Sequence, residues 1–364
     1  MMNNFDVGTF SNTGENGYIA KLDDIILVTG ANGFIGSRVV YMLLSSGFKR
    51  VRCFTRPSSK SVALEAIIKE FGQTSIEIVK GNLLSRDDCE KAVKEAAIIY
   101  HLAAGTDKTF PGCFLNSVVT TRNLLDAVIK EQGLKRFVNI SSLSVYSNEK
   151  IRRGGLMDES CEIDTKLVER YDPYAYGKAK QDEIVLEYAK TKGLPYVMVR
   201  PAVTFGPGKA KIPGRIGTDT FGVFMHLGLN NKMPLTYVDN CAEAIVLAGL
   251  RKGIEGEVIN IVDDDLPSSQ EFLRMYKKRV HDFVSIPIPY PAYYLFNYLW
   301  EQYSKWSDGQ LPPAFNRLMC ATYYKGNTYS NKKAKHLLAW HPRVGMTQAL
   351  ENLFLCAQEV KEKQ

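Results

Sequence analysis

The sequence predicts an α/β fold in which a parallel β-sheet is doubly wound, with helices on both of its faces. One observation is a glycine-rich segment, Gly30 to Gly36, that separates an apolar run from a second apolar stretch of helical character. Another is that strand-like and helix-like segments alternate up to about residue 200 without an internal repeat. Such alternation is typical of a right-handed parallel sheet.

Composition places the chain among ordinary globular proteins. Its 364 residues suggest one large domain or two closely joined ones, and 45% hydrophobic with 23% charged residues is a normal balance. The net charge of +7 is spread along the chain without a lysine-arginine block, so nucleic acid is not an expected partner, whereas a phosphorylated small molecule is. Seven cysteines without a Cys-x-x-Cys pair indicate reduced thiols and a cytoplasmic protein.

Three parts are expected along the chain. Residues 1–22 are rich in Asn, Gly, Ser and Thr and predict a flexible extension; the first twenty carry no Lys, Arg or apolar core, unlike a signal peptide. Residues 23–200 predict the dinucleotide-binding domain. Residues 201–364 predict a smaller substrate-binding region, within which 235–262 returns to the main sheet.

The first strand, turn and helix predict a phosphate site. Ile25 to Val28 is a buried-strand pattern, Gly30, Gly33 and Gly36 follow it, and an apolar helix then ends near Gly47. Glycines let the backbone approach a pyrophosphate, and the helix N-terminus directs free N–H groups at it. A turn that serves packing alone is the alternative, but the spacing and both flanking elements favour a dinucleotide.

The second strand, near residues 50–56, predicts which dinucleotide binds. Sites that prefer NAD usually carry an acid at its end to hold the ribose 2′-hydroxyl, and this chain has none there. Thr55 and Arg56 instead favour NADP over NAD, because a guanidinium can hold a 2′-phosphate. A solvated basic loop is the alternative.

The rest of the predicted dinucleotide-binding domain continues the alternation of strands and helices. We expect helices near 61–71 and 112–132 with a polar helix between them, and strands near 76–79, 97–104 and 137–140. His101, within the strand at 97–104, is interpreted as a packed, hydrogen-bonded core residue rather than a catalyst.

Two later segments carry chemistry. Ser141 and Ser142 follow the strand at 137–140, at the sheet edge where ligands bind in such folds. Tyr174 and Lys178 are four residues apart at the start of a helix that continues to about Lys192, so they share one face. A phenol with a pKa of about 10 is a poor base, and a neighbouring ammonium lowers that pKa.

Together these motifs resemble the extended short-chain dehydrogenase/reductase superfamily. The resemblance spans about residues 23–262, and more loosely the tail to Leu355. The motifs that carry it are Thr29-Gly30-Ala31-Asn32-Gly33-Phe34-Ile35-Gly36, His101-Leu102-Ala103-Ala104, Ser141-Ser142-x-x-Val145-Tyr146, Tyr174-x-x-x-Lys178 and Arg200-Pro201. It implies a Rossmann-type sheet and an NAD(P)-dependent oxidoreductase or epimerase.

The resemblance also implies roles for individual residues. Ser142 would polarise the substrate oxygen, Tyr174 would be the general base, and Lys178 would modulate the pKa of Tyr174 and touch the nicotinamide ribose. Asn116 corresponds to the family's asparagine in the helix after the fourth strand and is the fourth expected catalytic residue. Cofactor contacts are expected at Gly30, Asn32, Gly33, Phe34, Ile35, Gly36, Arg56, Asn82, Leu83, Leu102, Ala103, Ala104, Tyr174, Lys178, Pro201 and Val203. Asn82 replaces the aspartate that many members place against the adenine amine, and an amide can still accept that hydrogen bond.

The expected reaction is hydride transfer between nicotinamide and a secondary alcohol or ketone carbon, as in the 3β-hydroxysteroid dehydrogenase-like branch. A nucleotide-sugar epimerase that retains its cofactor is the alternative. Dehydration is disfavoured because Leu143-Ser144 stands where the family's dehydratases place Asp-Glu. A non-catalytic NAD(P)-sensing protein is a second alternative, less favoured because Tyr174 and Lys178 are both present.

The substrate region is less regular. Residues 206–231 resemble the family's variable substrate loop, and Asp239 is expected to cap the helix that follows it. Asp263, Asp264 and Asp265 are interpreted as solvated, and no metal site is expected.

Residues 286–300 form an apolar-aromatic stretch that is too short and too proline-broken to span a bilayer. Buried packing is the favoured interpretation; contact with a membrane surface and an apolar substrate pocket are the alternatives. The helices expected at 112–132 and 174–192 resemble those of the family's two-fold dimer, so a homodimer is expected.

Overall fold

A computed structural model of the chain describes residues 17–59, 62–209, 212–220, 222–308, 310–311 and 315–362. Most of the predicted N-terminal extension, residues 1–16, lies outside the described residues. The prediction of a flexible extension is wrong for residues 17–22. Tyr18 forms a bridge with Arg251 and the Ile19 amide donates to the Leu250 carbonyl at 2.9 Å, because these side chains pack against the core.

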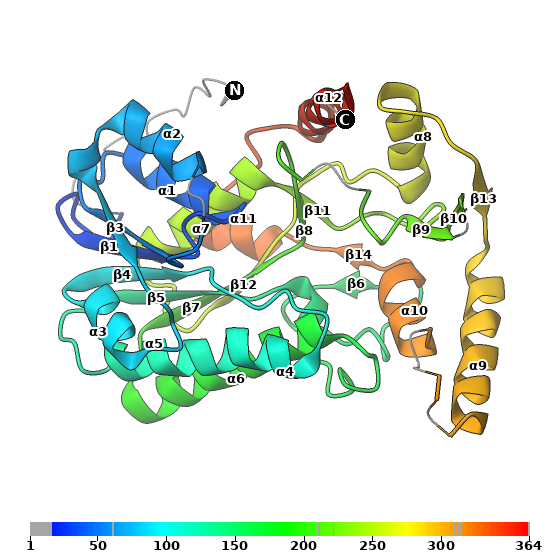
Figure 1. Cartoon of the computed structure of the whole chain (residues 1–364), viewed down its shortest axis with the longest axis horizontal. Helices are drawn as coiled ribbons and strands as arrows, with labels where there is room; N and C mark the ends of the chain where they lie inside the picture. The colour runs from blue at the N-terminus through cyan, green and yellow to red at the C-terminus, as the bar shows by residue number, and fades with distance from the viewer. Residues whose placement is uncertain are drawn as a thin grey trace.

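Seven strands of the described chain form one fully parallel sheet, in the order β12-β7-β5-β4-β1-β2-β3 (Figure 1). The strands are β1 (Ile25–Thr29), β2 (Val51–Thr55), β3 (Ile76–Lys80), β4 (Ala96–His101), β5 (Arg136–Ile140), β7 (Tyr196–Pro201) and β12 (Val258–Ile261). The inner strands are almost wholly buried because both faces of the sheet are covered. The predicted doubly wound parallel sheet is confirmed.

Helices cover both faces of this sheet (Figure 1). One layer holds α1 (Gly36–Ser45), α2 (Val62–Phe71), α7 (Val238–Leu250) and α11 (Lys332–Leu338). The other holds α3 (Arg86–Val93), α4 (Phe110–Cys113), α5 (Thr120–Val128) and α6 (Pro173–Lys192). The single helix expected at 112–132 is instead α4, a π-helical segment η2 (Phe114–Val119) and α5.

The remaining elements gather beside the carboxyl ends of the strands. They are β6 (Leu156–Met157), β8 (Val203–Phe205), β9 (Gly217–Thr220), β10 (Val223–His226), β11 (Leu235–Tyr237), β13 (Ser285–Pro287), β14 (Thr328–Tyr329), α8 (Ser269–Arg279), α9 (Tyr290–Trp306), α10 (Arg317–Tyr324) and α12 (Met346–Glu362). Within 235–262, β12 joins the main sheet and α7 its helical layer, whereas β11 pairs with β8. The stretch 206–231, expected to be irregular, contains the β9–β10 hairpin.

Two acidic residues differ from expectation. Asp239 does not cap α7; it lies inside the first turn, where it is buried and pairs with Arg38 Nε at 3.3 Å. Asp263 is not solvated, because it accepts hydrogen bonds from the Thr236 hydroxyl, the Tyr237 amide and the Asn240 side chain inside the protein.

The prediction that residues 286–300 are packed in the interior is also wrong. In α9 only Tyr293, Asn297 and Ser304 are buried, and large apolar side chains point outward. Among the described residues no helix has both the length and the apolar character needed to cross a membrane.

Candidate active site

The turn between β1 and α1 is shaped for close approach of a ligand. Gly30 has a left-handed backbone with φ of 68°, and a Cβ on Gly36 would collide with the Gly30 carbonyl oxygen. Ile35 begins α1 without a capping side chain among the described residues. The first turn of α1 therefore offers backbone N–H groups to an anion.

A cavity of about 230 Å³ lies against this turn. It is lined by Gly30, Asn32, Gly33, Phe54, Thr55, Arg56, Asn82, Leu83, Leu102, Ala103, Ala104, Asn116 and Thr120. The fold thus brings most of the sequence-predicted cofactor residues together from the ends of four strands, β1 to β4. The Thr55 hydroxyl is buried there with no hydrogen-bond partner in the described chain. A glycine cradle with an unpartnered hydroxyl beside it fits a dinucleotide.

The other predicted cofactor residues are not in the lining of this cavity. Phe34 and Ile35 belong to the same turn as Gly36, and Lys209 Nζ lies 5.7 Å from the centre of the Phe34 ring. Pro201 ends β7, and Val203, on β8, lines a different cavity.

His101 is a structural residue, as predicted. It is fully buried, its Nδ1 lies 2.8 Å from the Thr29 hydroxyl, and its Nε2 lies 2.8 Å from the Thr121 hydroxyl. Burial, with a smaller contribution from the Lys178 charge, lowers the pKa of His101 to about 3, so the ring is neutral.

Ser142 and Tyr174 lie together at the end of β5. Ser142 begins a short 3₁₀ turn and accepts from the Ser144 amide at 3.2 Å, and it shares a hydrogen bond with the Tyr174 hydroxyl. Although the Tyr174 side chain is partly exposed, desolvation of its hydroxyl raises the pKa of Tyr174 to about 12 despite the hydrogen bond with Ser142. The phenol is therefore protonated at neutral pH.

Lys178 shares this helix but is held elsewhere. Its ammonium donates to the Ile140 carbonyl and to the Gln181 side chain. Burial lowers the pKa of Lys178 to about 8, partly opposed by the Asp182 charge. The expected lowering of the Tyr174 pKa by Lys178 is not seen, because burial penalises the charged form of both groups.

Ser141 has a different role from Ser142. Its hydroxyl donates to Asp182 at 2.7 Å, and the same buried carboxylate accepts from Asn139 at 2.9 Å and from Arg200 at 3.1 Å. This network joins β5, α6 and β7 beneath the site. Ser141 is therefore buried within this network, whereas the Ser142 side chain is half-buried at the sheet edge.

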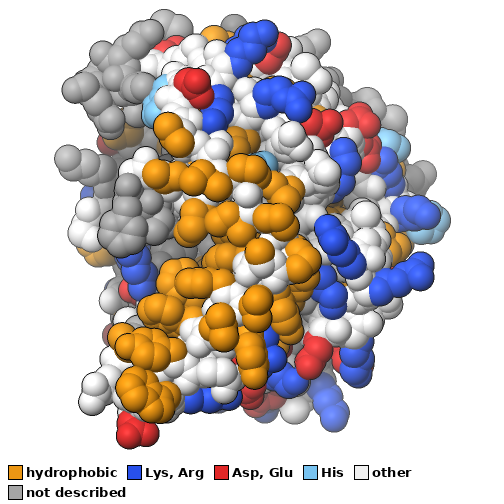
Figure 2. All heavy atoms as spheres, turned by 90° about the vertical axis from the view of Figure 1, so that its right-hand side faces the viewer, with side chains coloured by type: hydrophobic (Ala, Val, Ile, Leu, Met, Phe, Trp, Pro, Cys, Tyr) orange, Lys and Arg blue, Asp and Glu red, His pale blue; other side chains and the backbone are white. Residues whose placement is uncertain are grey.

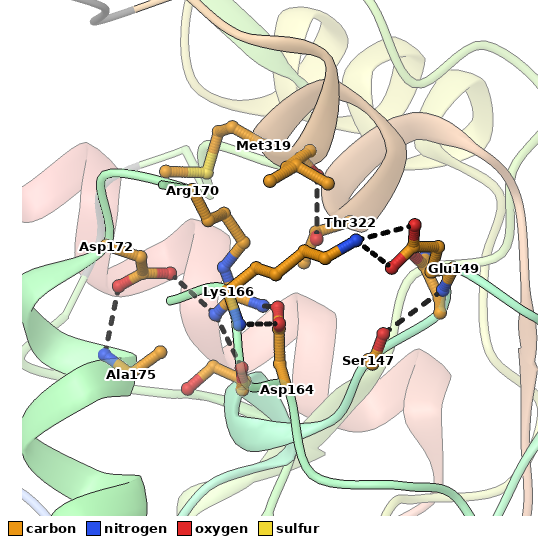
Figure 3. Close-up of polar contacts among 12 residues, drawn as sticks. Ser147, Glu149, Asp164, Lys166, Arg170, Asp172, Ala175, Met319 and Thr322 are labelled. Atoms are coloured by element: carbon orange, nitrogen blue, oxygen red, sulfur yellow. Dashed lines mark hydrogen bonds and ion pairs between the residues drawn. The ribbon is translucent and has the colours of Figure 1, made fainter. Parts of the chain in front are cut away.

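Arg170 ties together the two segments that carry Ser142 and Tyr174 (Figure 3). Its fully buried guanidinium donates to Asp164 at 2.9 Å, to Asp172 at 3.0 Å and to the Ser144 carbonyl at 2.6 Å. Asp172 caps α6 by accepting from the Ala175 amide at 2.9 Å.

Asn116 lies in the π-helical segment η2. Its amide donates to Asp107 at 3.0 Å and to the Gly112 carbonyl at 3.1 Å, and it lines the cavity at the glycine turn. The sequence pattern did not predict the π-helical geometry of this segment. Short π-helical segments inside α-helices are frequent at functional sites.

A second cavity, of about 600 Å³, lies between Lys209 and Tyr323. Tyr323, in the wall of this cavity, lies close enough to Tyr174 that ionisation of one phenol would oppose ionisation of the other, so the cavity lies near the predicted catalytic residues. Its walls are largely aromatic and aliphatic, and they also carry Lys209 and Arg215. Arg215 donates to the Thr322 carbonyl at 3.1 Å and to the Tyr329 hydroxyl at 3.3 Å, but within the described chain neither Arg215 nor Lys209 forms an ion pair with a carboxylate. The cavity therefore suits an apolar ligand with an anionic group.

A larger cavity of about 1070 Å³ lies on the other side of α10, with Lys166, Asp164 and Thr322 in its wall (Figure 3). It does not include Tyr174 or the glycine turn. No group of three or more His, Cys, Asp or Glu side chains in the described chain is placed to hold a metal.

Several site residues escaped sequence reasoning. Asp172 before Pro173 is a recognisable helix start, since an acidic cap followed by proline is typical of the first turn. Arg170, Lys209 and Arg215 gave no signal, because their positions depend on contacts between distant segments.

Comparison with known proteins places this site in a family. Residues 26–262 match the NAD dependent epimerase/dehydratase family. Sterol-4-alpha-carboxylate 3-dehydrogenase, decarboxylating, from Saccharomyces cerevisiae is 28% identical over 359 residues, covering 91% of this chain and 97% of the yeast protein. UDP-glucose 4-epimerase from Vibrio cholerae is 26% identical over 291 residues, covering 77% and 83%.

Solved structures share the fold. UDP-glucuronic acid 4-epimerase from Bacillus cereus, in complex with NAD, superposes with a TM-score of 0.68 at 22% identity, covering 92% of this chain and 99% of the epimerase. The chain belongs to the NAD dependent epimerase/dehydratase family, within the extended short-chain dehydrogenase/reductases, and is a nicotinamide-dependent enzyme.

Proposed function

We propose that the protein catalyses net hydride transfer between nicotinamide and a secondary alcohol or ketone on an apolar substrate that carries an anionic group. The observation that carries this proposal is the 600 Å³ cavity with aromatic walls and two cations, Lys209 and Arg215, that form no ion pair within the described residues. The match to a sterol-carboxylate dehydrogenase along nearly its whole length supports it.

The chain's own residues supply proton transfer and orientation. A bound nicotinamide supplies the hydride acceptor or donor. Ser142 holds the substrate oxygen by a hydrogen bond, and the neutral Tyr174 hydroxyl donates a proton to a ketone oxygen or, once ionised, accepts one from an alcohol. Lys178, four residues further along the same helix, would contact the cofactor ribose. These roles are our proposal for the site residues.

The cofactor proposal favours NADP. Arg56 is exposed at the rim of the dinucleotide cavity, and the sequence offers no acid at the end of β2 to hold a free 2′-hydroxyl. NAD is the alternative, in keeping with the NAD-bound epimerase structure.

A nucleotide-sugar epimerase is the second candidate, because the two cations would also suit a diphosphate. One assay separates the candidates. Purified protein is mixed with NAD⁺ or NADP⁺ and, in parallel, a carboxylated sterol, the same sterol without the carboxylate, or UDP-glucose. We expect reduced nicotinamide to accumulate with the carboxylated sterol only. Epimerised sugar without net reduction would contradict the proposal.

Tyr174→Phe tests the mechanism within the same assay. The variant should bind reduced cofactor normally and lose turnover by about 10²–10⁴-fold, because the ring remains while the proton-exchanging hydroxyl is removed. Turnover near the wild-type rate would refute the role of Tyr174.

A further inference from the structure

Helix α9 presents two different faces. Its inner face packs on the protein through Tyr293 and Asn297, and the Tyr293 ring meets the Tyr324 ring edge-on at 5.6 Å. Its outer face carries Leu295 (57% exposed), Leu299 (57%) and Trp306 (78%), spaced by four and seven residues. A surface helix normally places charged and polar residues on that side.

The outer face is part of a wider apolar area, which we call the α9 face. Figure 2 shows it as an almost continuous orange surface on the side of the molecule formed by β13 and α9. Its exposed members are Val284, Ile286, Tyr294, Leu295, Phe296, Tyr298, Leu299, Tyr303 and Trp306. Contiguous exposed apolar areas of this kind mark a binding surface.

Cations border the α9 face. Lys277 lies over the Phe283 ring at 4.9 Å, Arg153 over Tyr290 at 6.0 Å and Arg317 over Tyr298 at 4.9 Å. In Figure 2, Lys and Arg side chains line the right-hand edge of the apolar area.

Acids on the same segments offset part of this charge: the four cations Arg153, Lys277, Lys305 and Arg317 face three acids, which leaves a net charge of +1. Asp282 and Glu301 pair with Lys277 and Arg317, and Lys305, in the last turn of α9, is exposed. Asp308 is exposed just beyond the helix. Anionic surfaces attract such a border.

The composition and length of α9 favour a bilayer surface over a bilayer span. Tyr and Trp rings are enriched at the membrane–water boundary, because one part of the ring is apolar and another is polar. At 17 residues, with Glu301 and Lys305 near its end, α9 suits a position in the plane of the interface.

The charge pattern disfavours a second copy as the occupant. Lys277 lies toward the β13 end of the α9 face and Lys305 toward the α9 C-terminal end. Pairing two identical faces would bring Lys277 and Lys305 against their own kind, and Asp282 and Asp308 likewise, whether the helices ran parallel or antiparallel. The homodimer expected from the sequence would use α4, α5 and α6, on another side of the molecule (Figure 1).

We propose that the α9 face docks the protein onto the surface of an anionic lipid bilayer. The apolar side chains enter the headgroup boundary and the bordering cations meet anionic headgroups. This proposal stands independently of the reaction that the site catalyses.

The test is sedimentation with vesicles. Full-length protein is mixed with vesicles of phosphatidylcholine alone, or of phosphatidylcholine and phosphatidylglycerol in equal parts, at low and high salt. We expect binding to the anionic vesicles that weakens with salt. Trp306 should report the contact by a blue shift of its emission, and Trp306→Phe should remove the shift.

Matched variants identify the surface. Leu295→Ser/Leu299→Ser should weaken vesicle binding by about tenfold or more, since each side chain would lose its apolar contact. Leu355→Ser, on α12 and 58% exposed, is the control and should bind like the wild type. Equal binding of reduced cofactor shows that each variant is folded.

Three results would overturn the proposal. The first is that the wild type does not bind anionic vesicles. The second is that the control and the double variant lose vesicle binding equally. The third is that light scattering shows a wild-type dimer that becomes a monomer in the double variant, while lipid binding does not change.

Discussion

Arg170 offers the sharpest test of how the site is held together. Replacing it with Met keeps the approximate length of the side chain but removes the cation between Asp164 and Asp172. Both carboxylates would then lie at or near the interior without their partner, at side-chain exposures of 10% and 8%. Breaking a buried ion pair by removing one partner costs about 3–5 kcal/mol, so we expect a loss of that size in the free energy of unfolding.

The effect on turnover should exceed the effect on cofactor binding. Arg170 holds the Ser144 carbonyl in the turn that carries Ser142, and it holds Asp172 at the start of the helix that carries Tyr174. The glycine turn after β1 makes none of these contacts. We therefore expect kcat to fall while the affinity for reduced cofactor stays within about twofold, since a misplacement of about 1 Å is enough to cost 10²-fold in rate.

The measurements are urea denaturation, steady-state kinetics and a fluorescence titration with reduced cofactor. Arg122→Met is the matched control, because Arg122 and Glu187 form an exposed pair at 3.7 Å, worth at most about 1 kcal/mol. Arg170→Lys should recover part of the turnover, since it restores the charge without the planar fork. A stability loss no larger than that of Arg122→Met, or a parallel loss of cofactor affinity and turnover, would refute the positioning role.

Three further predictions concern other parts of the site. Ser142→Ala should lower turnover with little change in cofactor affinity; a silent Ser142→Ala beside an inactive Ser141→Ala would reverse our assignment. Because the pKa of Lys178 is about 8, cofactor affinity should fall as pH rises from 7 to 9 and the ammonium is lost, and Lys178→Met should flatten that profile; a flat wild-type profile would exclude the contact. Arg56→Ala should weaken NADP binding by about 1–3 kcal/mol and leave NAD binding unchanged by calorimetry; a wild type that prefers NAD would contradict this.

The parts of the fold that follow from local pattern were predictable. The buried strand β1, its glycine turn and α1 are consecutive in sequence, so their period and punctuation identify them. The pairing of Tyr174 with Lys178 on one helix face needs only a spacing of four residues. The edge at which Ser142 emerges follows from the rule that parallel strands end together.

What the sequence could not show depends on contacts between distant segments. The Arg170 guanidinium donates to the carbonyl of Ser144, which is 26 residues away in sequence. The backbone carbonyl of Arg170 accepts a hydrogen bond from Asn316, which is 146 residues away. The aromatic stretch of α9 also depends on contacts between distant segments, and here the sequence led to a wrong prediction. Its apolar content suggested burial, but only the packing against α10 decides which side is covered and leaves Leu295 and Leu299 outside.

The protonation of Tyr174 and Lys178 shows why spacing alone does not define a catalytic pair. In water, an ammonium four residues away would favour the phenolate, which is the reasoning that the sequence supports. Inside the protein, desolvation raises the pKa of Tyr174 to about 12 and lowers that of Lys178 to about 8. Burial therefore stabilises the neutral form of each side chain relative to its charged form. The ammonium is directed to the Ile140 carbonyl and Gln181. The phenol is therefore ready to donate a proton at neutral pH, and its action as a base requires that the site first offset the cost of a buried phenolate.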